Sequence, residues 1–414
     1  MARLRGFERL TGVDEALTTF LKEHRLERLA AVQVFLHEAL ERVLAEDAVA
    51  ESDLPPFDRS AVDGYALKAK DTFGASQVSP KVLKLTNEDR IDEGEARQIW
   101  TGSPLPRGAD AVVMLEHTKR VRGGIQVWSP VTPSHNVSMR GEDVKRGEVA
   151  VKEGTRLRPH HIGLLAALGK AHVSVVEKPK VAILSTGSEL VELGSKPKPA
   201  QVVDVNRLIL SGLCVELGAD PLDLGIVRDD LNEIKAKIQE GIDRADVVLT
   251  TGGTSVGYAD LVPMAINQIA APGVIVHGIA MRPAMPTALA ILHGKPLIAL
   301  SGNPVAAMIG FEVFARPLIL KLLGVKSEPR PVLKARLTRR VPSVLGRRVF
   351  LRVHAFEREG EFFAEPVRIK GAGVLTTMTK ANGYVIIPED REGLAEGEPV
   401  TVHLFDRVGG AQLV

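Results

Sequence analysis

The feature that most constrains the fold is an alternation of short apolar runs with helical segments, which begins at Lys178. Val181–Leu184, Leu222–Val227, Val247–Leu249 and Leu297–Leu300 are typical of buried strands, and amphipathic helical patterns lie between them. Strands joined by helices pair in parallel, because each helical connection returns the chain to the same end of the sheet. The sequence therefore predicts a three-layer α/β domain with a mostly parallel sheet over residues 179–327.

The chain on either side of this region has a different pattern. Prolines, glycines and short apolar runs between Leu54 and Val144 indicate a small β-rich domain. Apolar residues recur at helical spacing in the first ~50 residues, which predicts a helical N-terminal segment. After Pro329, the alternation in Arg348–His354 predicts a small antiparallel domain or β-barrel.

Composition excludes several classes of function. Of the 414 residues, 53 are Lys or Arg and 51 are Asp or Glu, so we expect neither a nucleic-acid partner nor a membrane partner. Cys214 is the single cysteine, which rules out an internal disulfide and a cysteine-based zinc site. The N-terminus lacks the apolar core of a signal peptide, and no stretch approaches the ~18 apolar residues of a membrane span. We therefore predict a cytoplasmic protein.

Polar loops follow each of the four predicted strands. They are S-T-G-S-E (185–189), R-D-D (228–230), T-T-G-G-T-S-V-G-Y-A-D (250–260) and S-G-N-P (301–304). Ligands of open parallel sheets bind beyond the carboxyl ends of the strands, where these loops lie together. Glycines let backbone N–H groups turn toward a phosphate, and the helix N-terminus behind each loop adds positive potential. A single such loop is often only a turn or a helix cap, but four at one edge favour a binding site.

The third loop lacks the lysine of the common phosphate-binding motif G-x-x-x-x-G-K-[ST]. Acidic residues stand among these loops instead, and they would repel an anion unless a cation lay between. Mg²⁺ prefers oxygen ligands and often bridges carboxylates to phosphates, so we predict a magnesium site at Glu189, Asp229 and Asp260. The loop residues predicted to bind the phosphorylated ligand are Ser185, Thr186, Gly187, Thr251, Gly252, Gly253, Ser255, Gly257, Ser301, Gly302, Asn303 and Pro304.

Together with these loops, three further motifs carry a resemblance to a known family. They are F-D-R-S-A-V-D-G-Y-A (57–66), T-G-S-P-L-P-R-G-A-D-A-V-V (101–113) and R-G-E-D-V (140–144). Each motif alone is weak, but the whole set spans nearly the full chain. The sequence closely resembles the molybdopterin molybdenumtransferases of the MoeA and gephyrin E-domain type.

This resemblance implies an activity and an assembly. Members of the family insert molybdenum from molybdate into adenylylated molybdopterin with Mg²⁺ and release AMP. They are elongated homodimers in which the partner's β domain completes the cleft. The domains implied for this chain are an elongated N-terminal domain of two segments (1–50 and 145–178), an inserted β-rich domain (51–144), an α/β molybdopterin-binding domain (179–327) and a C-terminal β-barrel (328–414).

The resemblance also implies residue roles. As catalytic residues it points to Asp63, Thr101, Asp143, Glu189, Asp229, Asp260 and Arg282. It places oxyanion binding at Arg352 and Thr376, whereas Ala372 stands where some members have serine. Where the family usually has a K-P-G-K-P run, this chain has M-R-P-A-M-P (281–286), so Met285 replaces a lysine and Ala284 a glycine.

Alternative functions remain open at this stage. The α/β region also resembles the molybdopterin adenylyltransferases and, more weakly, a family that acts on nicotinamide nucleotides. A non-catalytic molybdopterin-binding scaffold is a third alternative. Candidate partners are the adenylyltransferase and molybdopterin synthase, and no residue discriminates molybdate from tungstate.

Overall fold

The computed structural model describes residues 10–23, 27–253, 261–367 and 373–408. The chain divides into two compact units, of which the first comprises Met1–Val32 and Val176–Val414 and the second comprises Gln33–Val175. Each unit has its own sheets and core, and each is described by itself.

A six-stranded sheet forms the centre of the first unit. Its order is β16 (Asp220–Val227), β13 (Lys180–Thr186), β17 (Val247–Thr251), β21 (Lys295–Leu300), β20 (Ala288–Leu292) and β18 (Gly273–His277). The first four strands are parallel, as predicted, whereas β20 pairs antiparallel with both β21 and β18. The sheet is therefore mixed, and β18 and β20 are strands that the sequence pattern did not predict.

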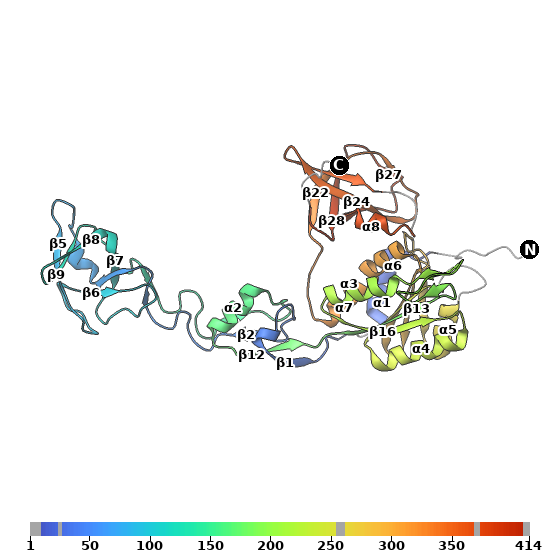
Figure 1. The fold of residues 1–414 in the computed structure, drawn as a ribbon, viewed down its shortest axis with the longest axis horizontal. Coiled ribbons are helices and arrows are strands. Elements are labelled where there is room, and N and C mark those ends of the chain that lie inside the picture. Colours follow the sequence, from blue (N-terminus) through green and yellow to red (C-terminus); the bar gives the residue numbers. More distant parts are fainter. Residues whose placement is uncertain (1–9, 24–26, 254–260, 368–372, 409–414) are drawn as a thin grey trace, which may run out of the picture. The chain divides into compact units, whose positions relative to one another are not determined.

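Helices cover both faces of this sheet (Figure 1). One face carries α4 (Leu231–Arg244) and α5 (Leu261–Ile269), and the other carries α3 (Asn206–Glu216), α6 (Pro304–Gly310) and α1 (Val13–Glu23). Ala182 and Leu184 alternate toward α4, where they pack with Ile234 and Ile238. The predicted three-layer arrangement is confirmed, and α3 ends before Gly218, whose φ of 84° provides the left-handed turn expected there.

The helix behind the fourth loop is continuous but irregular. After α6 the chain passes through one π-helical segment (Phe311–Ala315) into α7 (Arg316–Leu322), and it turns at Gly324. Leu300 packs against this helix so closely that a Cβ on Gly310 would lie 2.7 Å from its Cδ2. The helix N-terminus is thereby held directly behind Ser301–Pro304.

A closed five-stranded barrel follows the sheet within the first unit. Its strands are β24 (Arg348–Arg358), β25 (Glu361–Pro366), β22 (Val332–Leu337), β28 (Pro399–Leu404) and β26 (Gly383–Ile387), and the ring closes because β24 also pairs with β26. Leu351, Val353 and Ala355 alternate into its core. A short pair is formed by β23 (Val341–Pro342) and β27 (Gly393–Leu394), and α8 spans Thr376–Thr379. The predicted barrel is confirmed.

One short strand ties the barrel to the α/β sheet. β19 (Met281–Arg282) pairs in parallel with β24, with Met281 opposite Arg348 and Arg282 opposite Val349. The Arg348 guanidinium also holds the Asp14 carboxylate of α1 through two hydrogen bonds of 2.8 and 2.7 Å. The M-R-P-A-M-P run therefore lies against the start of β24.

The second unit is also built on a six-stranded sheet. Its order is β7 (Ala111–Met114), β4 (Gly64–Leu67), β6 (Glu95–Ile99), β5 (Lys81–Leu85), β9 (Gly124–Val127) and β8 (Thr118–Val121). Smaller pairs join β3 (Arg59–Ser60) to β10 (Val137–Ser138), β2 (Ala48–Val49) to β11 (Val149–Val151), and β1 (Ala31–Phe35) to β12 (His172–Val176). The β-rich region predicted between Leu54 and Val144 is thus β-rich in the structure.

The prediction of a helical N-terminal segment is wrong for most of its length. Only α1 and a single 3-10 turn (Leu36–Glu38) are helical among the described residues before position 50. Ala31–Phe35 is a strand instead, because pairing with the distant His172–Val176 outweighs the local helical spacing. The second unit does contain a helix, α2 (Pro159–Ala167). There His161 accepts a hydrogen bond from the backbone N–H of Arg158 at 3.1 Å, which is a capping role.

Candidate functional site

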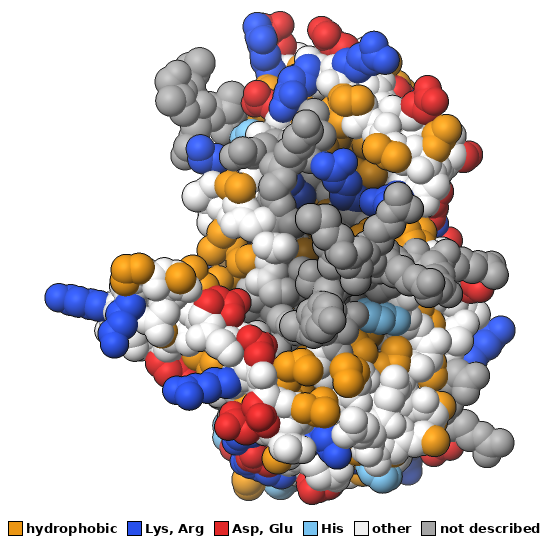
Figure 2. Space-filling view, turned by 90° about the vertical axis from the view of Figure 1, so that its right-hand side faces the viewer, with side chains coloured by type: hydrophobic (Ala, Val, Ile, Leu, Met, Phe, Trp, Pro, Cys, Tyr) orange, Lys and Arg blue, Asp and Glu red, His pale blue; other side chains and the backbone are white. Residues whose placement is uncertain are grey.

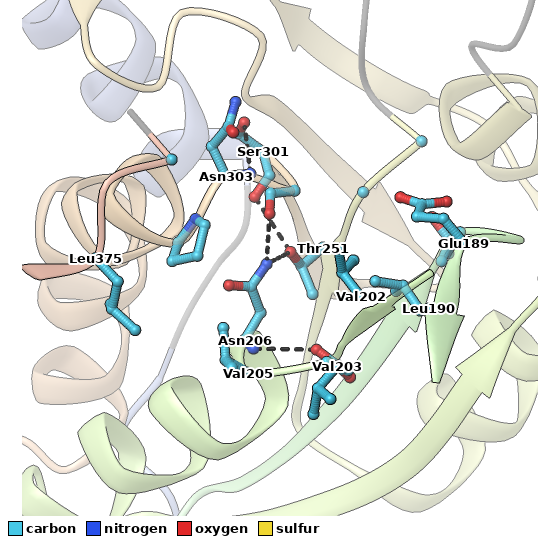
Figure 3. A pocket seen from close by; sticks show the side chains of 18 of the residues that line it. Glu189, Leu190, Val202, Val203, Val205, Asn206, Thr251, Ser301, Asn303 and Leu375 are labelled. Carbon is cyan, nitrogen blue, oxygen red and sulfur yellow. Dashed lines mark hydrogen bonds between the residues drawn. The ribbon is translucent and has the colours of Figure 1, made fainter. Parts of the chain in front are cut away.

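The carboxyl ends of the parallel strands open into a pocket of ≈ 870 Å³. Residues from all four predicted loops line it, and Figure 3 shows the pocket with Glu189 on one side and Leu375 on the other. The predicted ligand-binding and metal residues along its wall are Thr186, Gly187, Glu189, Asp229, Thr251, Gly252, Gly253, Ser301, Gly302, Asn303 and Pro304.

The loops meet backbone to backbone, and glycine permits this approach. Gly252 has a φ of +92°, and a Cβ at this position would lie 2.1 Å from the carbonyl oxygen of Thr186. A Cβ on Gly302 would lie 3.4 Å from the Cα of Gly252. Three strand-end loops are therefore stacked closely at Gly252 along one wall of the pocket.

Glu189 and Asp229, the two described residues predicted as metal ligands, both line this pocket. A Cβ on Gly187 would lie 2.7 Å from the Oε2 atom of Glu189, so this carboxylate is folded over the Gly187 backbone. The Oδ2 atom of Asp229 accepts a hydrogen bond from the N–H of Ser188 at 3.0 Å. Asp230 has a different role, because its side chain caps α4 by accepting from the N–H groups of Asn232 and Glu233.

The two carboxylates fit a magnesium ion that keeps several waters and binds substrate phosphate. The described residues contain no cluster of three or more His, Cys, Asp or Glu side chains with metal-site geometry. Asp260, the third predicted ligand, lies outside the described residues, as do Ser255, Gly257 and Ala372. Of the three predicted magnesium ligands, the structure thus places Glu189 and Asp229 on the wall of the pocket.

Sequence reasoning missed the pocket wall that precedes α3. The Nδ2 atom of Asn206 donates to the Oγ1 of Thr251 at 2.7 Å and to the carbonyl of Gly302 at 2.8 Å, so one side chain ties two loops together (Figure 3). Asp204 accepts from the N–H of Asn206 at 3.0 Å and from the Nε of Arg207 at 2.6 Å. Polar residues clustered at the start of a predicted helix, D-V-N-R, were the available signal.

Two residues that the sequence predicted to contact the ligand, Ser185 and Thr376, do not line the pocket. Ser185 is fully buried, and its Oγ atom has no hydrogen-bond partner in the described part of the chain. Thr376 begins α8 and is exposed, whereas its neighbour Leu375 lines the pocket.

A second recess, of ≈ 320 Å³, adjoins the first pocket and shares Pro286, Ser301 and Asn303 with it. Arg282 and Arg352, both predicted from the sequence, line this recess, and so does Arg347. Arg352 is 5% exposed, and burial followed by the nearby charge of Arg282 lowers its pKa. Figure 2 shows Lys and Arg side chains gathered where the barrel, above, meets the α/β sheet and its helices, below.

The remaining predicted residues belong to the second unit. Thr101 donates to the Oδ1 atom of Asp63 from its N–H at 2.8 Å and from its hydroxyl at 2.7 Å. These hydrogen bonds, the backbone one first, lower the pKa of Asp63 and keep its carboxylate ionised. Asp143 is exposed, and its N–H donates to the carbonyl of Leu54 at 3.0 Å.

The fold and pockets of the first unit define a class of protein. A mixed α/β sheet with glycine and hydroxyl loops at its strand ends, beside an arginine-lined recess, belongs to a binder of phosphorylated, anionic ligands. The comparisons with known proteins then specify the family.

Three family models match consecutive parts of the chain. "MoeA N-terminal region (domain I and II)" matches residues 11–169, "Probable molybdopterin binding domain" matches 182–321, and "MoeA C-terminal region (domain IV)" matches 334–405. The molybdopterin molybdenumtransferase of Bacillus subtilis is 34% identical over 97% of this chain and 95% of its own, and that of Staphylococcus aureus is 32% identical over 95% of both. A crystal structure of the molybdopterin biosynthesis MoeA protein of Pyrococcus horikoshii is 35% identical, with a TM-score of 0.83 over 96% of this chain and all of its own.

The chain therefore belongs to the molybdopterin molybdenumtransferase (MoeA) family. The resemblance drawn from the sequence motifs is confirmed, and with it a place in molybdenum cofactor biosynthesis.

Proposed function

We propose that this chain transfers molybdenum from molybdate to adenylylated molybdopterin and releases AMP. Relatives that align over nearly their whole length carry the name molybdopterin molybdenumtransferase. The observation that carries the proposal is the pair of adjoining pockets, which share Ser301 and Asn303. A phosphorylated ligand and a separate oxyanion need two such neighbouring sites, whereas an adenylyltransferase or a scaffold does not need the second.

Each group of residues has a part in this reaction. The glycine loops at Gly253 and Gly302 line the phosphate site, and Asn206 holds these two loops together. Glu189 and Asp229 would hold Mg²⁺, which, when bound, neutralises negative charge on the phosphoanhydride. Arg282 and Arg352 hold the oxyanion in the adjoining recess. Thr251 and Ser301 line the pocket with buried hydroxyl side chains.

The departures in the M-R-P-A-M-P run leave its backbone turn in place. Ala284 has a φ of 75°, a left-handed conformation that favours glycine, and its carbonyl accepts a hydrogen bond from the buried Thr287 hydroxyl at 2.8 Å. The turn that relatives are expected to build with glycine is thus retained with alanine. Met285 lines the recess but offers no charge to an oxyanion.

The reaction can be tested by the product that it releases. The purified chain, incubated with adenylylated molybdopterin, Mg²⁺ and molybdate, is expected to release AMP at a rate that depends on both ions. Incubation with molybdopterin and ATP is the matched control, because pyrophosphate release would identify an adenylyltransferase. Ligand binding without either product would favour a scaffold. Tungstate in place of molybdate measures the preference that the residues leave undecided.

The proposal extends to the assembly and the location. We place the domain boundaries at 1–50 with 145–178, 51–144, 179–327 and 328–414, and the matched family regions support this layout. A homodimer with composite clefts, in which Asp63, Thr101 and Asp143 act beside the strand-end pocket, belongs to the same proposal. The described residues form no helix long and apolar enough to cross a membrane, and a cytoplasmic location remains a prediction.

If each cleft contains residues from both subunits, two inactive variants should restore activity when they are mixed. Asp63 belongs to the second unit and Asp229 to the first, and each single variant, Asp63→Ala or Asp229→Ala, should be inactive. Mixing the two under conditions that exchange subunits should restore about a quarter of the AMP-release rate, because half of the dimers are then mixed and each has one intact cleft. If both residues serve a cleft within one chain, the mixture will stay as inactive as its components.

A further inference from the structure

We propose that Arg347, assisted by Ser343, is an oxyanion-binding residue that forms the second wall of the recess beside the phosphate pocket. Neither residue was among the positions to which the sequence resemblance assigned a role. The inference rests on the proposed function for the identity of the ligand, a tetrahedral dianion of the molybdate class.

The recess is bounded on two sides by segments that are distant in the sequence. One wall is the Met281–Pro286 run, and the other contains Val341–Ser343 and Arg347. The parallel pairing of β19 with β24 sets Arg282 opposite Val349, and the N–H of Arg348 donates to the carbonyl of Ala280 at 2.9 Å. Arg347, the residue before β24, is therefore held beside the strand that carries Arg282.

The charges around the recess are unbalanced. Its described lining includes Arg282, Arg347 and Arg352 but neither Asp nor Glu. Among the described residues, the side chains of Arg282 and Arg347 make no ion pair and no hydrogen bond. Like charges gathered without a carboxylate repel one another, and the lowered pKa of Arg352 reflects its burial first and the charge of Arg282 second. A bound dianion removes this repulsion.

The neighbouring Arg348, in contrast to Arg347, has ion-pair partners among the described residues. Arg348 forms ion pairs with Asp14 at 2.7 Å and with Glu389 at 3.0 Å. Two adjacent arginines thus have separate roles, because one fastens α1 to the barrel while the other is half-buried on the recess. A guanidinium held on a recess without a protein partner can offer its planar pair of N–H donors to an oxyanion.

Ser343 adds a neutral donor to the same wall. Ser343 lines the recess, and its Oγ atom is buried and has no hydrogen-bond partner among the described residues. Its backbone N–H donates to the carbonyl of Glu392 at 2.7 Å, which fixes the position of the residue. Buried hydroxyls are rarely left without a partner, and an oxyanion in the recess supplies one.

The recess has the size and location for a small anion. Its volume of ≈ 320 Å³ is less than half that of the adjoining pocket of ≈ 870 Å³. Because Ser301 and Asn303 line both, an oxyanion there lies next to the bound phosphates. Met285 occupies the position at which a lysine was expected, and Arg347 supplies a cation to the same recess from the barrel.

The test is direct titration of the full chain with sodium molybdate by calorimetry, without any pterin substrate. Arg347→Ala should weaken molybdate binding by about 10- to 100-fold, the effect typical of losing a charged hydrogen-bonding group. Arg347→Lys should recover part of the affinity, and Ser343→Ala should weaken binding by about 3- to 10-fold. Arg340→Ala is the matched control, because Arg340 is an exposed arginine of the same barrel outside the recess, and it should bind as the parent does.

Two outcomes would overturn the inference. One is parent-like molybdate affinity in a folded Arg347→Ala chain, and the other is absence of saturable molybdate binding by the parent at millimolar concentration. The proposed function is judged separately by AMP release. If molybdate binding depends on Arg347 but no AMP is released, the oxyanion site is supported and the proposed reaction is contradicted. If Arg347→Ala releases AMP with the parent's KM for molybdate, the proposed reaction is supported and the role of Arg347 is contradicted.

Discussion

Asp229→Asn is expected to slow Mg²⁺-dependent AMP release by about 100-fold or more, whereas Asp230→Asn should leave the rate almost unchanged. The two carboxylates are neighbours in one loop but have different surroundings. Asp229 lines the strand-end pocket, and its replacement removes a negative charge and a hard oxygen donor from the proposed magnesium site. Loss of charge stabilisation at a reacting phosphoanhydride typically costs several kcal/mol.

Asn at position 229 can retain the local structure. Its side-chain oxygen can still accept from the N–H of Ser188, as the Asp229 carboxylate does at 3.0 Å. At position 230, Asn preserves the cap on α4, because Asn caps a helix about as well as Asp. Both variants should therefore unfold at the parent's denaturant concentration, and the difference between them should appear only in activity.

The measurement is the initial rate of AMP release over a range of Mg²⁺ concentrations. If Asp229→Asn weakens metal binding, high Mg²⁺ should recover part of the rate. Equal rates for the two variants at low Mg²⁺ would remove Asp229 from the metal site. Glu189 and Asp260 would then be the remaining predicted ligands.

Arg207→Ala should destabilise the first unit by about 3–5 kcal/mol, the typical effect of removing one partner from a buried ion pair. The side chain of Arg207 is 10% exposed and contacts Asp204 at 2.6 Å, Asp223 at 2.7 Å and Glu192 at 2.5 Å. Burial alone would lower the pKa of Arg207, but the hydrogen bonds to these acids outweigh it and raise the pKa. The Asp204 side chain is only 2% exposed, so without Arg207 its charge is left buried.

Two further variants identify the cause. Arg244→Ala removes an arginine that is 52% exposed and pairs with Glu240 on the surface of α4, so it should cost about 0.5 kcal/mol or less. The double variant Asp204→Ala/Arg207→Ala should regain part of the stability that Arg207→Ala loses, because no charge is then left buried without its partner. Denaturant unfolding of the full chain measures all three. Equal midpoints for Arg207→Ala and Arg244→Ala would show that the buried ion pairs contribute little.

Local patterns in the sequence were sufficient for the α/β sheet and its loops. Buried apolar runs such as Val181–Leu184 identify a strand because both faces of the central strands are covered. The grouping of the strand-end loops could also be predicted, since parallel strands present their carboxyl ends at one edge of the sheet. The sequence pattern did not identify β18 and β20, because short apolar runs do not distinguish a strand from a buried helix.

The error at Ala31–Phe35 has a related cause. The apolar residues there recur at a spacing that a helix would also satisfy, and only pairing with His172–Val176, far along the chain, selects the strand. Asn206 and Arg207 were overlooked for the same reason, because their hydrogen-bond partners lie on other strands and loops.

The sequence by itself determined the family, the polar strand-end loops and the acidic residues suited to a metal, because these depend on residue types at short spacing. The tertiary structure decided which of them meet. Glu189 and Asp229 line one pocket, whereas Asp230 caps α4. Arg347 and Arg282 line the adjoining recess. The physical reason is strand pairing: the register of β19 with β24 joins residues more than sixty positions apart, and no local pattern contains that contact.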